Sequence, residues 1–128
     1  MTPRVANFRQ RLGATGEDAA ARELTRRGYR ILERNVRTRF GELDVVARDG
    51  ETVCFIEIKA RRSSAFGWPQ EAITWQKQRH LVRLAQWYLK ARHLPNVSAR
   101  FDVVALLLGP DDRPTSIEVI QNAFQVPA

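Results

Sequence analysis

The Asp49-Gly50 pair constrains the fold of this chain more than any other feature, because it separates two runs of alternating or continuous apolar residues. An Asp-Gly pair in that setting is the strongest short-range signal for a tight β-hairpin. A two-residue loop at this pair predicts that Arg48 faces Glu51 across the hairpin. The hairpin, within residues 41–62, is therefore expected to lie at the centre of the fold.

Alternation along the two strands predicts one apolar face and one face that mixes charged and apolar residues, because successive side chains point to opposite sides of a sheet. The apolar face is expected to hold Leu43, Val45, Cys54, Ile56 and Ile58. The mixed face is expected to hold Glu42, Asp44, Val46, Val53, Phe55, Glu57 and Lys59. On that face Asp44 and Glu57 form a diagonal pair of like charges, which repel and need a counter-charge. A Mg²⁺ or Mn²⁺ ion with oxygen ligands would supply it, with the Lys59 ammonium directed to the same place. The alternative is an ordinary hairpin whose acids pair with Arg61 or Arg37.

The mixed face resembles the PD-(D/E)xK nuclease core, in which an aspartate is followed after a hairpin by Glu-x-Lys. Here these residues are Asp44 and then Glu57-Ile58-Lys59. The wider pattern is similar to the YraN family, small bacterial proteins regarded as nuclease-like and related in fold to archaeal Holliday-junction resolvases. The residues that carry the resemblance are Gly16-Glu17, 41–44, 55–61, Lys77-Gln78 and 100–104.

The resemblance implies a restriction-endonuclease-like core and a metal-dependent endonuclease that hydrolyses phosphodiester bonds in DNA, branched or structured DNA included. Asp44 and Glu57 would bind Mg²⁺ or Mn²⁺, with the carbonyl oxygen of Ile58 as a further ligand. Lys59 would orient the attacking water, and Glu17 would support the metal cluster. Resolvase-like relatives act as dimers, so a homodimer is one expected assembly. The alternative function is a catalytically silent accessory protein that binds nucleic acid and keeps the nuclease fold.

The charge distribution indicates a nucleic-acid partner, with a basic composition that serves no specific partner as the alternative. The resemblance implies DNA rather than RNA. The formal net charge is +7, yet residues 41–58 contain five acidic residues and one arginine. Residues 59–100 contain nine lysines or arginines and one acid. An acidic spot within a basic surface suits a metal centre that acts on a polyanion. The candidate nucleic-acid-binding residues are Arg37, Arg39, Arg61, Arg62, Lys77 and Gln78, with solvated surface as the alternative for Arg37 and Arg39.

The order of elements predicts an α/β fold with a mixed central β-sheet flanked by helices. The predicted elements are a helix over 15–27 capped by Gly28, a strand over 29–34, a basic lead over 35–40, the hairpin, a helix from 73 or 74 to 93, and strands over 99–108 and 116–120, followed by a tail that packs back. Glu17 falls on the buried stripe of the first helix, where it either interacts with the helix dipole or reaches the metal cluster. Asp102 interrupts the strand over 99–108 and is expected to be a structural or supporting acid paired with an arginine.

The length of 128 residues indicates one nuclease-like domain over 15–128, preceded by a basic arm over 1–14. The chain has no apolar run of membrane-spanning length and no apolar segment of a signal peptide, so a cytoplasmic protein without a membrane partner is expected. Its single cysteine, Cys54, suits a reducing compartment. Phe66 and Trp68, in a loop beside the predicted site, would either stack on bases or anchor the loop by packing.

Overall fold

The computed structural model describes residues 16–62, 73–94 and 96–124; the predicted basic arm, Thr15, Phe66, Trp68 and Pro95 lie outside this part. Five strands form one sheet in the order β1-β2-β3-β4-β5, in which β3 and β4 are parallel and all other neighbours are antiparallel. The elements after a helix over residues 16–26 are β1 (Arg30–Thr38), β2 (Gly41–Asp49), β3 (Thr52–Arg61), α2 (Trp75–Ala91), β4 (Ala99–Leu108) and β5 (Pro114–Phe124). The predicted α/β fold with a mixed sheet is confirmed, and it is compatible with a restriction-endonuclease-like core.

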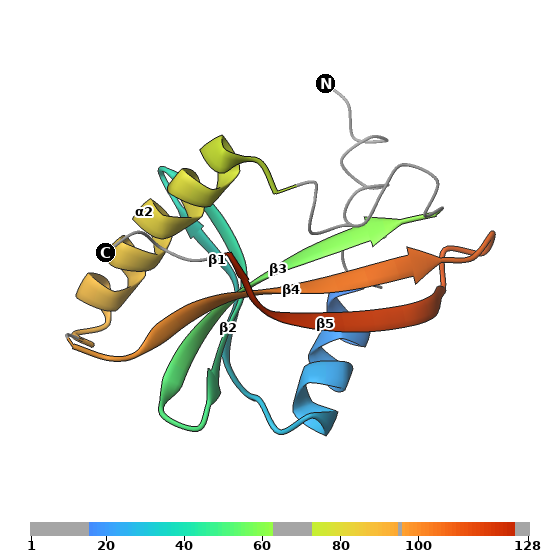
Figure 1. The fold of residues 1–128 in the computed structure, drawn as a ribbon, viewed down its shortest axis with the longest axis horizontal. Coiled ribbons are helices and arrows are strands. Elements are labelled where there is room, and N and C mark those ends of the chain that lie inside the picture. Colours follow the sequence, from blue (N-terminus) through green and yellow to red (C-terminus); the bar gives the residue numbers. More distant parts are fainter. Residues whose placement is uncertain (1–15, 63–72, 95, 125–128) are drawn as a thin grey trace.

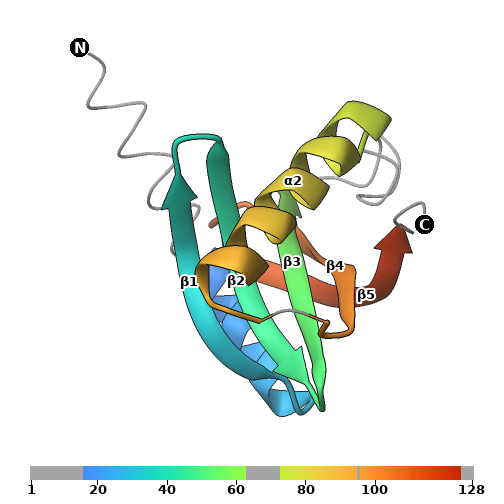
Figure 2. The same cartoon turned by 90° about the vertical axis from the view of Figure 1, so that its left-hand side faces the viewer.

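The two helices cover opposite faces of the sheet (Figures 1 and 2). The helix over 16–26 buries Ala20 and Leu24 against Val45, Cys54 and Ile56, the predicted apolar face. The mixed face lies under α2, whose buried residues are Leu81, Leu84, Ala85 and Tyr88. Both cores are built from the central hairpin, as expected of strands buried on both sides. No helix in the described part of the chain is long and apolar enough to cross a membrane.

The central turn differs from the prediction by one residue, and this changes the pairing of the two strands. Asp49 pairs with Thr52, so the two loop residues are Gly50 and Glu51 rather than Asp49 and Gly50. Gly50 has φ +62 at the first loop position, where a type II′ turn requires a glycine. Arg48 consequently faces Val53, not Glu51. The predicted register was wrong by two residues, an even shift that leaves the side chains on their predicted faces.

Two outer strands are longer than predicted. β1 runs through Asn35 to Thr38, so most of the predicted basic lead is strand. β5 runs to Phe124, so the predicted tail belongs to the sheet, and Phe124 stacks on Phe101 with ring centroids 4.7 Å apart. The predicted end of the first helix is confirmed by Gly28, whose φ is +98. The lengths of the outer strands were underestimated because exposed strands carry polar residues on both faces, which weakens the alternation of apolar and polar residues.

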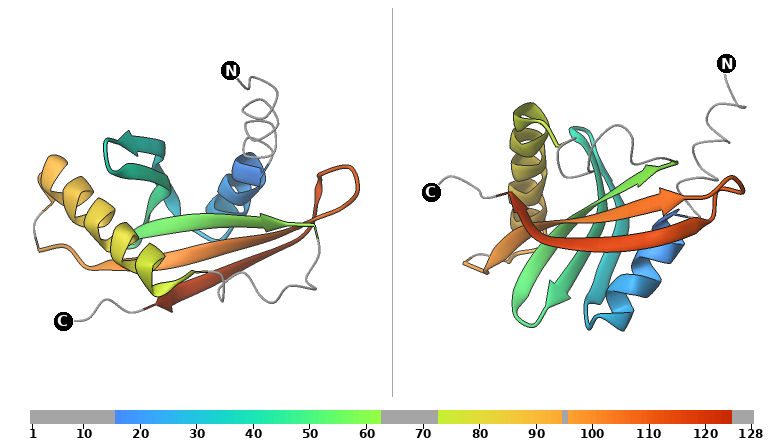
Figure 3. Two further views of the ribbon diagram at one scale, coloured as in Figure 1. Left: turned by 90° about the horizontal axis from the view of Figure 1, so that it is seen from above. Right: turned by 45° about the vertical axis from the view of Figure 1, so that its right-hand side comes forward.

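β2 and β3 diverge beyond the turn, and this divergence creates the surroundings of the predicted site. Their pairing ends at Val45 and Ile56, while β3 continues beside β4 to Arg61. Figure 1 and the left view of Figure 3 show the first half of β2 leaving the plane of β3, β4 and β5. The positive φ of Asn35, +54, lies in the neighbouring part of β1. The twist also brings Leu43 under α2, which corrects its predicted place on the opposite face.

Replacing Gly41 with alanine is expected to lower the free energy of unfolding by about 1–3 kcal/mol. Gly41 has φ +147, and a Cβ atom there would lie 2.5 Å from Nε2 of His80 on α2. Urea denaturation measures the loss. Gly50→Ala is the control, because Gly50 also has a positive φ but no atom near the position of its Cβ. Equal losses in both variants would show that the contact with His80 contributes nothing.

Candidate metal centre

The predicted carboxylates meet where β2 leaves β3. Asp44 is the residue of β2 just before the last pair with β3, and its Oδ2 atom accepts a hydrogen bond of 2.9 Å from the backbone N–H of Ile58. The carboxylate thus binds an N–H group for which the diverging strand offers no backbone partner. Since a strand residue directs its N–H and C=O to the same edge, the Ile58 carbonyl is directed to this side as well.

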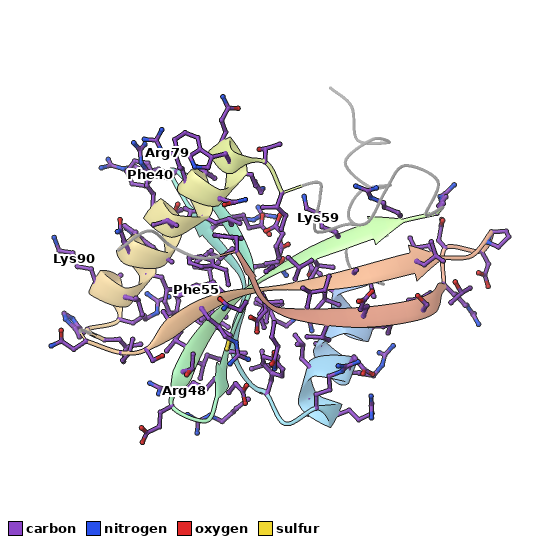
Figure 4. The ribbon with its side chains drawn as sticks, viewed as in Figure 1. Phe40, Arg48, Phe55, Lys59, Arg79 and Lys90 are labelled. Carbon is purple, nitrogen blue, oxygen red and sulfur yellow. The ribbon has the colours of Figure 1, made fainter. Side chains whose placement is uncertain are left out.

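Glu57 is the second carboxylate, and it lies on the α2 side of β3. Only 8% of its surface is exposed, so its charge needs partners. Its Oε1 atom is 3.6 Å from Nζ of Lys59 on β3 and 3.3 Å from Nζ of Lys77 on α2. Figure 4 shows Lys59 on β3 near the end of that strand. The structure therefore gives Glu57 two ammonium groups from two elements.

Asp44 lacks such compensation. Within the described residues, no lysine or arginine forms an ion pair with it. Burial, together with the charges of Glu57, Glu17 and Glu42, raises the pKa of Asp44 to about 7, against the opposing effect of the Ile58 N–H. This carboxylate is the position at which an added cation would be most stabilising.

Asp44→Asn is expected to stabilise the metal-free protein at pH 8 by roughly 2 kcal/mol, allowing for partial solvent exposure. Because the folded-state pKa of Asp44 lies above the unfolded value, ionisation costs stability. That cost is absent below about pH 4, grows as pH rises, and is complete above about pH 7. The stability difference between variant and wild type should therefore grow from pH 5 to pH 8 in urea denaturation with EDTA.

The matched control is Glu51→Gln, which removes an exposed carboxylate from the turn of the same hairpin. Its effect should change little with pH. Adding Mn²⁺ at pH 8 should raise the melting temperature of the wild type and not that of Asp44→Asn, because binding to the folded state alone stabilises it. A stability difference that shrinks with rising pH would contradict a raised pKa at Asp44.

The donors at this centre fit a hard divalent cation. In residues 16–62, 73–94 and 96–124, no three His, Cys, Asp or Glu side chains converge to form a metal site by themselves. Two carboxylates, of Asp44 and Glu57, and the backbone carbonyl of Ile58 are nevertheless available on neighbouring strands. Mg²⁺ often binds through one or two carboxylates and completes its octahedron with water and substrate phosphate. The uncompensated charge of Asp44 is the observation that favours such an ion.

Glu17 reaches this region from the helix over 16–26, on the other side of the sheet from α2. Its Oε2 atom accepts a hydrogen bond of 2.8 Å from Nδ2 of Asn35 and lies 3.8 Å from the Arg34 guanidinium. Its charge contributes to the raised pKa of Asp44, so it acts on the centre electrostatically. Asn35, which positions it, was not among the predicted residues; only the tolerance of asparagine for positive φ could have indicated it.

The predicted nucleic-acid-binding residues fall in different places. Lys77 contacts Glu57, as described above. Gln78 donates from its side-chain amide to the Ile73 carbonyl, 3.1 Å away, which secures the start of α2. Arg37 lies 3.6 Å from Glu42, and Arg39 lies over the ring of Phe40.

Arg61 and Arg62 lie at the end of β3. Arg61 pairs with Leu107 of β4 in the parallel ladder. Arg62 forms an ion pair with Asp112 in the turn between β4 and β5. Both residues therefore lie just after Glu57 and Lys59 in the sequence, at the end of β3 that is distant from the central turn.

Asp102 lies apart from the centre, in agreement with its predicted structural role. Its side chain is fully buried and accepts hydrogen bonds from Arg100 at 3.0 and 3.1 Å. The Tyr29 hydroxyl, 2.8 Å away, and the backbone N–H of Asn122 also donate to it. These hydrogen bonds join β4 to β5 and to Tyr29, the residue just before β1.

Comparison with known proteins identifies relatives along most of the chain. The family model described as "Uncharacterised protein family UPF0102" matches residues 16–106. A UPF0102 protein of Moorella thermoacetica is 50% identical over 91% of this chain and 97% of its own length. One of Syntrophus aciditrophicus is 47% identical over 91% of this chain and 90% of its own length. One of Trichlorobacter lovleyi is 45% identical over 97% of this chain and 98% of its own length.

Proposed function

This chain belongs to the uncharacterised protein family UPF0102, as the resemblance to the YraN family predicted. The family name states no activity, so we propose a function from the geometry of the candidate metal centre. We propose that the protein is a metal-dependent endonuclease that hydrolyses phosphodiester bonds in DNA. The observation that carries the proposal is the convergence of Asp44, Glu57 and Lys59 where two paired strands separate. Strands β2 and β3 hold these side chains in place, because both belong to the central sheet.

The side chains present have distinct tasks in this proposal. Asp44 and Glu57, with the Ile58 carbonyl, would hold Mg²⁺ or Mn²⁺. When bound, the ion would act as a Lewis acid on the scissile phosphate and would make a water molecule more acidic. Lys59 would orient the attacking water and offset the negative charge that develops on the phosphate oxygens. Lys77 would hold Glu57 in place from α2, and Glu17 would strengthen the local negative field that attracts the ion.

A catalytically silent nucleic-acid-binding accessory protein is the second candidate, and one observation favours it. Glu57 already contacts two ammonium groups, Lys59 and Lys77, at 3.6 and 3.3 Å. A carboxylate neutralised in this way has less need of a metal ion than Asp44 has. In this second proposal the centre stabilises the fold, and the basic segments alone provide the function.

Cleavage of labelled DNA distinguishes the two proposals. The full chain is incubated with single-stranded, duplex, flap and four-way-junction DNA in Mg²⁺, in Mn²⁺ and in EDTA. The nuclease proposal expects cleavage that requires a divalent ion. Salt-sensitive binding without cleavage of any of these substrates would favour the accessory protein, because phosphate contacts alone give strongly salt-dependent affinity. A parallel RNA series tests the proposed preference for DNA.

A cytoplasmic location and a homodimer are further parts of the proposal. Cys54 is free and buried, as suits a reducing compartment that contains DNA. Sedimentation of the full chain at several concentrations measures whether a dimer forms.

A further inference from the structure

The outer face of α2 consists of Trp75, Arg79, Arg83, Gln86 and Lys90, which follow one another at helical spacing. These positions share one side of a helix, opposite the buried residues Leu81, Leu84, Ala85 and Tyr88. All five residues of the outer face are exposed. Figure 4 shows Arg79 and Lys90 on the side of α2 that points away from the sheet, whereas Phe55 lies beneath the helix. Nothing in the described fold covers this face.

Charge on this face has one sign only. α2 contains no aspartate or glutamate, and its first turn lacks the acidic residue that the helix dipole favours. Within the described residues, neither Arg83 nor Lys90 forms an ion pair. Three cations in a row, without acids between them, form a track for a polyanion.

An exposed tryptophan accompanies this track. Trp75 is 65% exposed, the highest value among the large apolar residues described, and the Arg79 guanidinium lies 4.8 Å from its ring centroid. Trp87, 36% exposed, lies on the flank of the same face. A single exposed apolar side chain is ordinary on a protein surface, so it is the position of Trp75 beside the row of cations that marks it out. Aromatic rings beside arginines are the surfaces on which unpaired bases stack, since every base has a π-face.

The track begins at the end of α2 that borders the candidate metal centre. Trp75 is the first residue of α2, and Lys77, two residues later on the inner side, contacts Glu57 at 3.3 Å. A strand lying along the outer face would thus pass over the end of the helix that borders the candidate site. A second copy of the chain is a poor occupant, because a two-fold contact would place the same cations against each other.

We propose that the outer face of α2 binds an unpaired nucleic-acid strand, with a base stacked on Trp75 and its phosphates on Arg79, Arg83 and Lys90. The inference rests on the proposed function in taking this strand to be the substrate of the metal centre. It narrows that substrate to DNA with an unpaired segment next to the cleaved bond. In a duplex the faces of the bases are already stacked, so Trp75 would gain no partner there.

Binding is measured by fluorescence anisotropy, with the full chain carrying Glu57→Gln in EDTA, on labelled oligo(dT) and on a blunt duplex. Trp75→Leu is expected to weaken binding to oligo(dT) by about fivefold or more, and binding to the duplex by less than about twofold. Trp75→Phe, which keeps a ring, should retain binding to oligo(dT) within about threefold. Equal losses on both DNAs, or no loss on either, would overturn the proposal.

The cations are tested separately, so that the result does not depend on one substitution. Arg83→Gln combined with Lys90→Gln should reduce the slope of log affinity against log salt by about 1.4, at about 0.7 per phosphate contact on a single strand. Arg113→Gln, which removes an 83% exposed charge from the turn between β4 and β5, should leave the affinity nearly unchanged. Competition by poly-glutamate equal to that by oligo(dT) would show a general acidic partner and overturn the assignment.

The failure of this proposal differs from that of the nuclease proposal. If the wild type cuts DNA with metal but Trp75→Leu binds and cuts single-stranded substrates normally, the stacking surface is refuted and the nuclease stands. If Trp75→Leu loses binding to oligo(dT) while the wild type cuts no substrate, the stacking surface is supported and the nuclease proposal fails.

Discussion

Glu57→Gln is expected to reduce metal-dependent DNA cleavage by about a thousandfold or more while leaving DNA affinity within about threefold. The reason is that glutamine keeps the shape of the side chain but removes a charge that would hold the ion. Loss of a metal's stabilisation of transition-state charge amounts to several kcal/mol, and each 1.36 kcal/mol is a tenfold change in rate. Single-turnover cleavage and anisotropy binding, measured on the same DNA, separate the two effects.

Glu51→Gln is the matched control, because Glu51 lies in the exposed turn of the same hairpin. It should cut DNA at the wild-type rate. Lys59→Met should also abolish cleavage, since Lys59 is the proposed group that orients water. Equal loss of cleavage and binding in Glu57→Gln, together with a lower melting temperature, would instead indicate that Glu57 is a structural residue.

The sequence was sufficient to place the central hairpin, because alternation and a turn signal agreed there. The error at the turn moved the register by two residues, and an even shift keeps the paired residues 45–49 and 52–56 on their predicted faces. For that reason Glu57 and Phe55 were assigned to the correct side although the predicted register was wrong. Side-chain faces are thus predicted more robustly than strand pairs.

The features that complete the candidate metal centre depend on contacts between residues that are far apart in the sequence. That Lys77 binds nucleic acid stays a prediction, and its contact with Glu57 comes from the packing of α2 on the hairpin. The twist of β2 places Leu43 on the face opposite to the predicted one. A pattern of strictly alternating residues cannot predict such a twist. Asn35 holds Glu17 through a hydrogen bond that only the path of β1 creates. Tertiary packing, rather than local pattern, decides these positions.

Asp102→Ala is expected to lower the free energy of unfolding by about 3–5 kcal/mol, the largest effect on stability that we predict. The side chain is fully buried between Arg100 and Tyr29. Burial by itself would lower the pKa of Arg100, but hydrogen bonds to Asp102, Asp49 and Tyr29 raise it overall. A guanidinium is not deprotonated in proteins, so Arg100 remains charged in the variant. A partly buried guanidinium, with Asp49 as its remaining carboxylate partner, and an unpaired backbone N–H at Asn122 would be left.

Asp111→Ala provides the comparison for this loss, because Asp111 and Arg113 form an ion pair of the same type at the surface, with side chains 65% and 83% exposed. An exposed pair contributes between about 0 and 1 kcal/mol, so this variant should unfold almost as the wild type does. Asp49, 2.7 Å from Arg100, keeps part of the charge balanced and places the expected loss for Asp102→Ala nearer to 3 kcal/mol. In thermal unfolding that corresponds to a shift of about 10 °C. A loss below about 1 kcal/mol would show that solvent or a rearranged Arg100 replaces the buried carboxylate, and that β4 and β5 are joined by their backbone ladder alone.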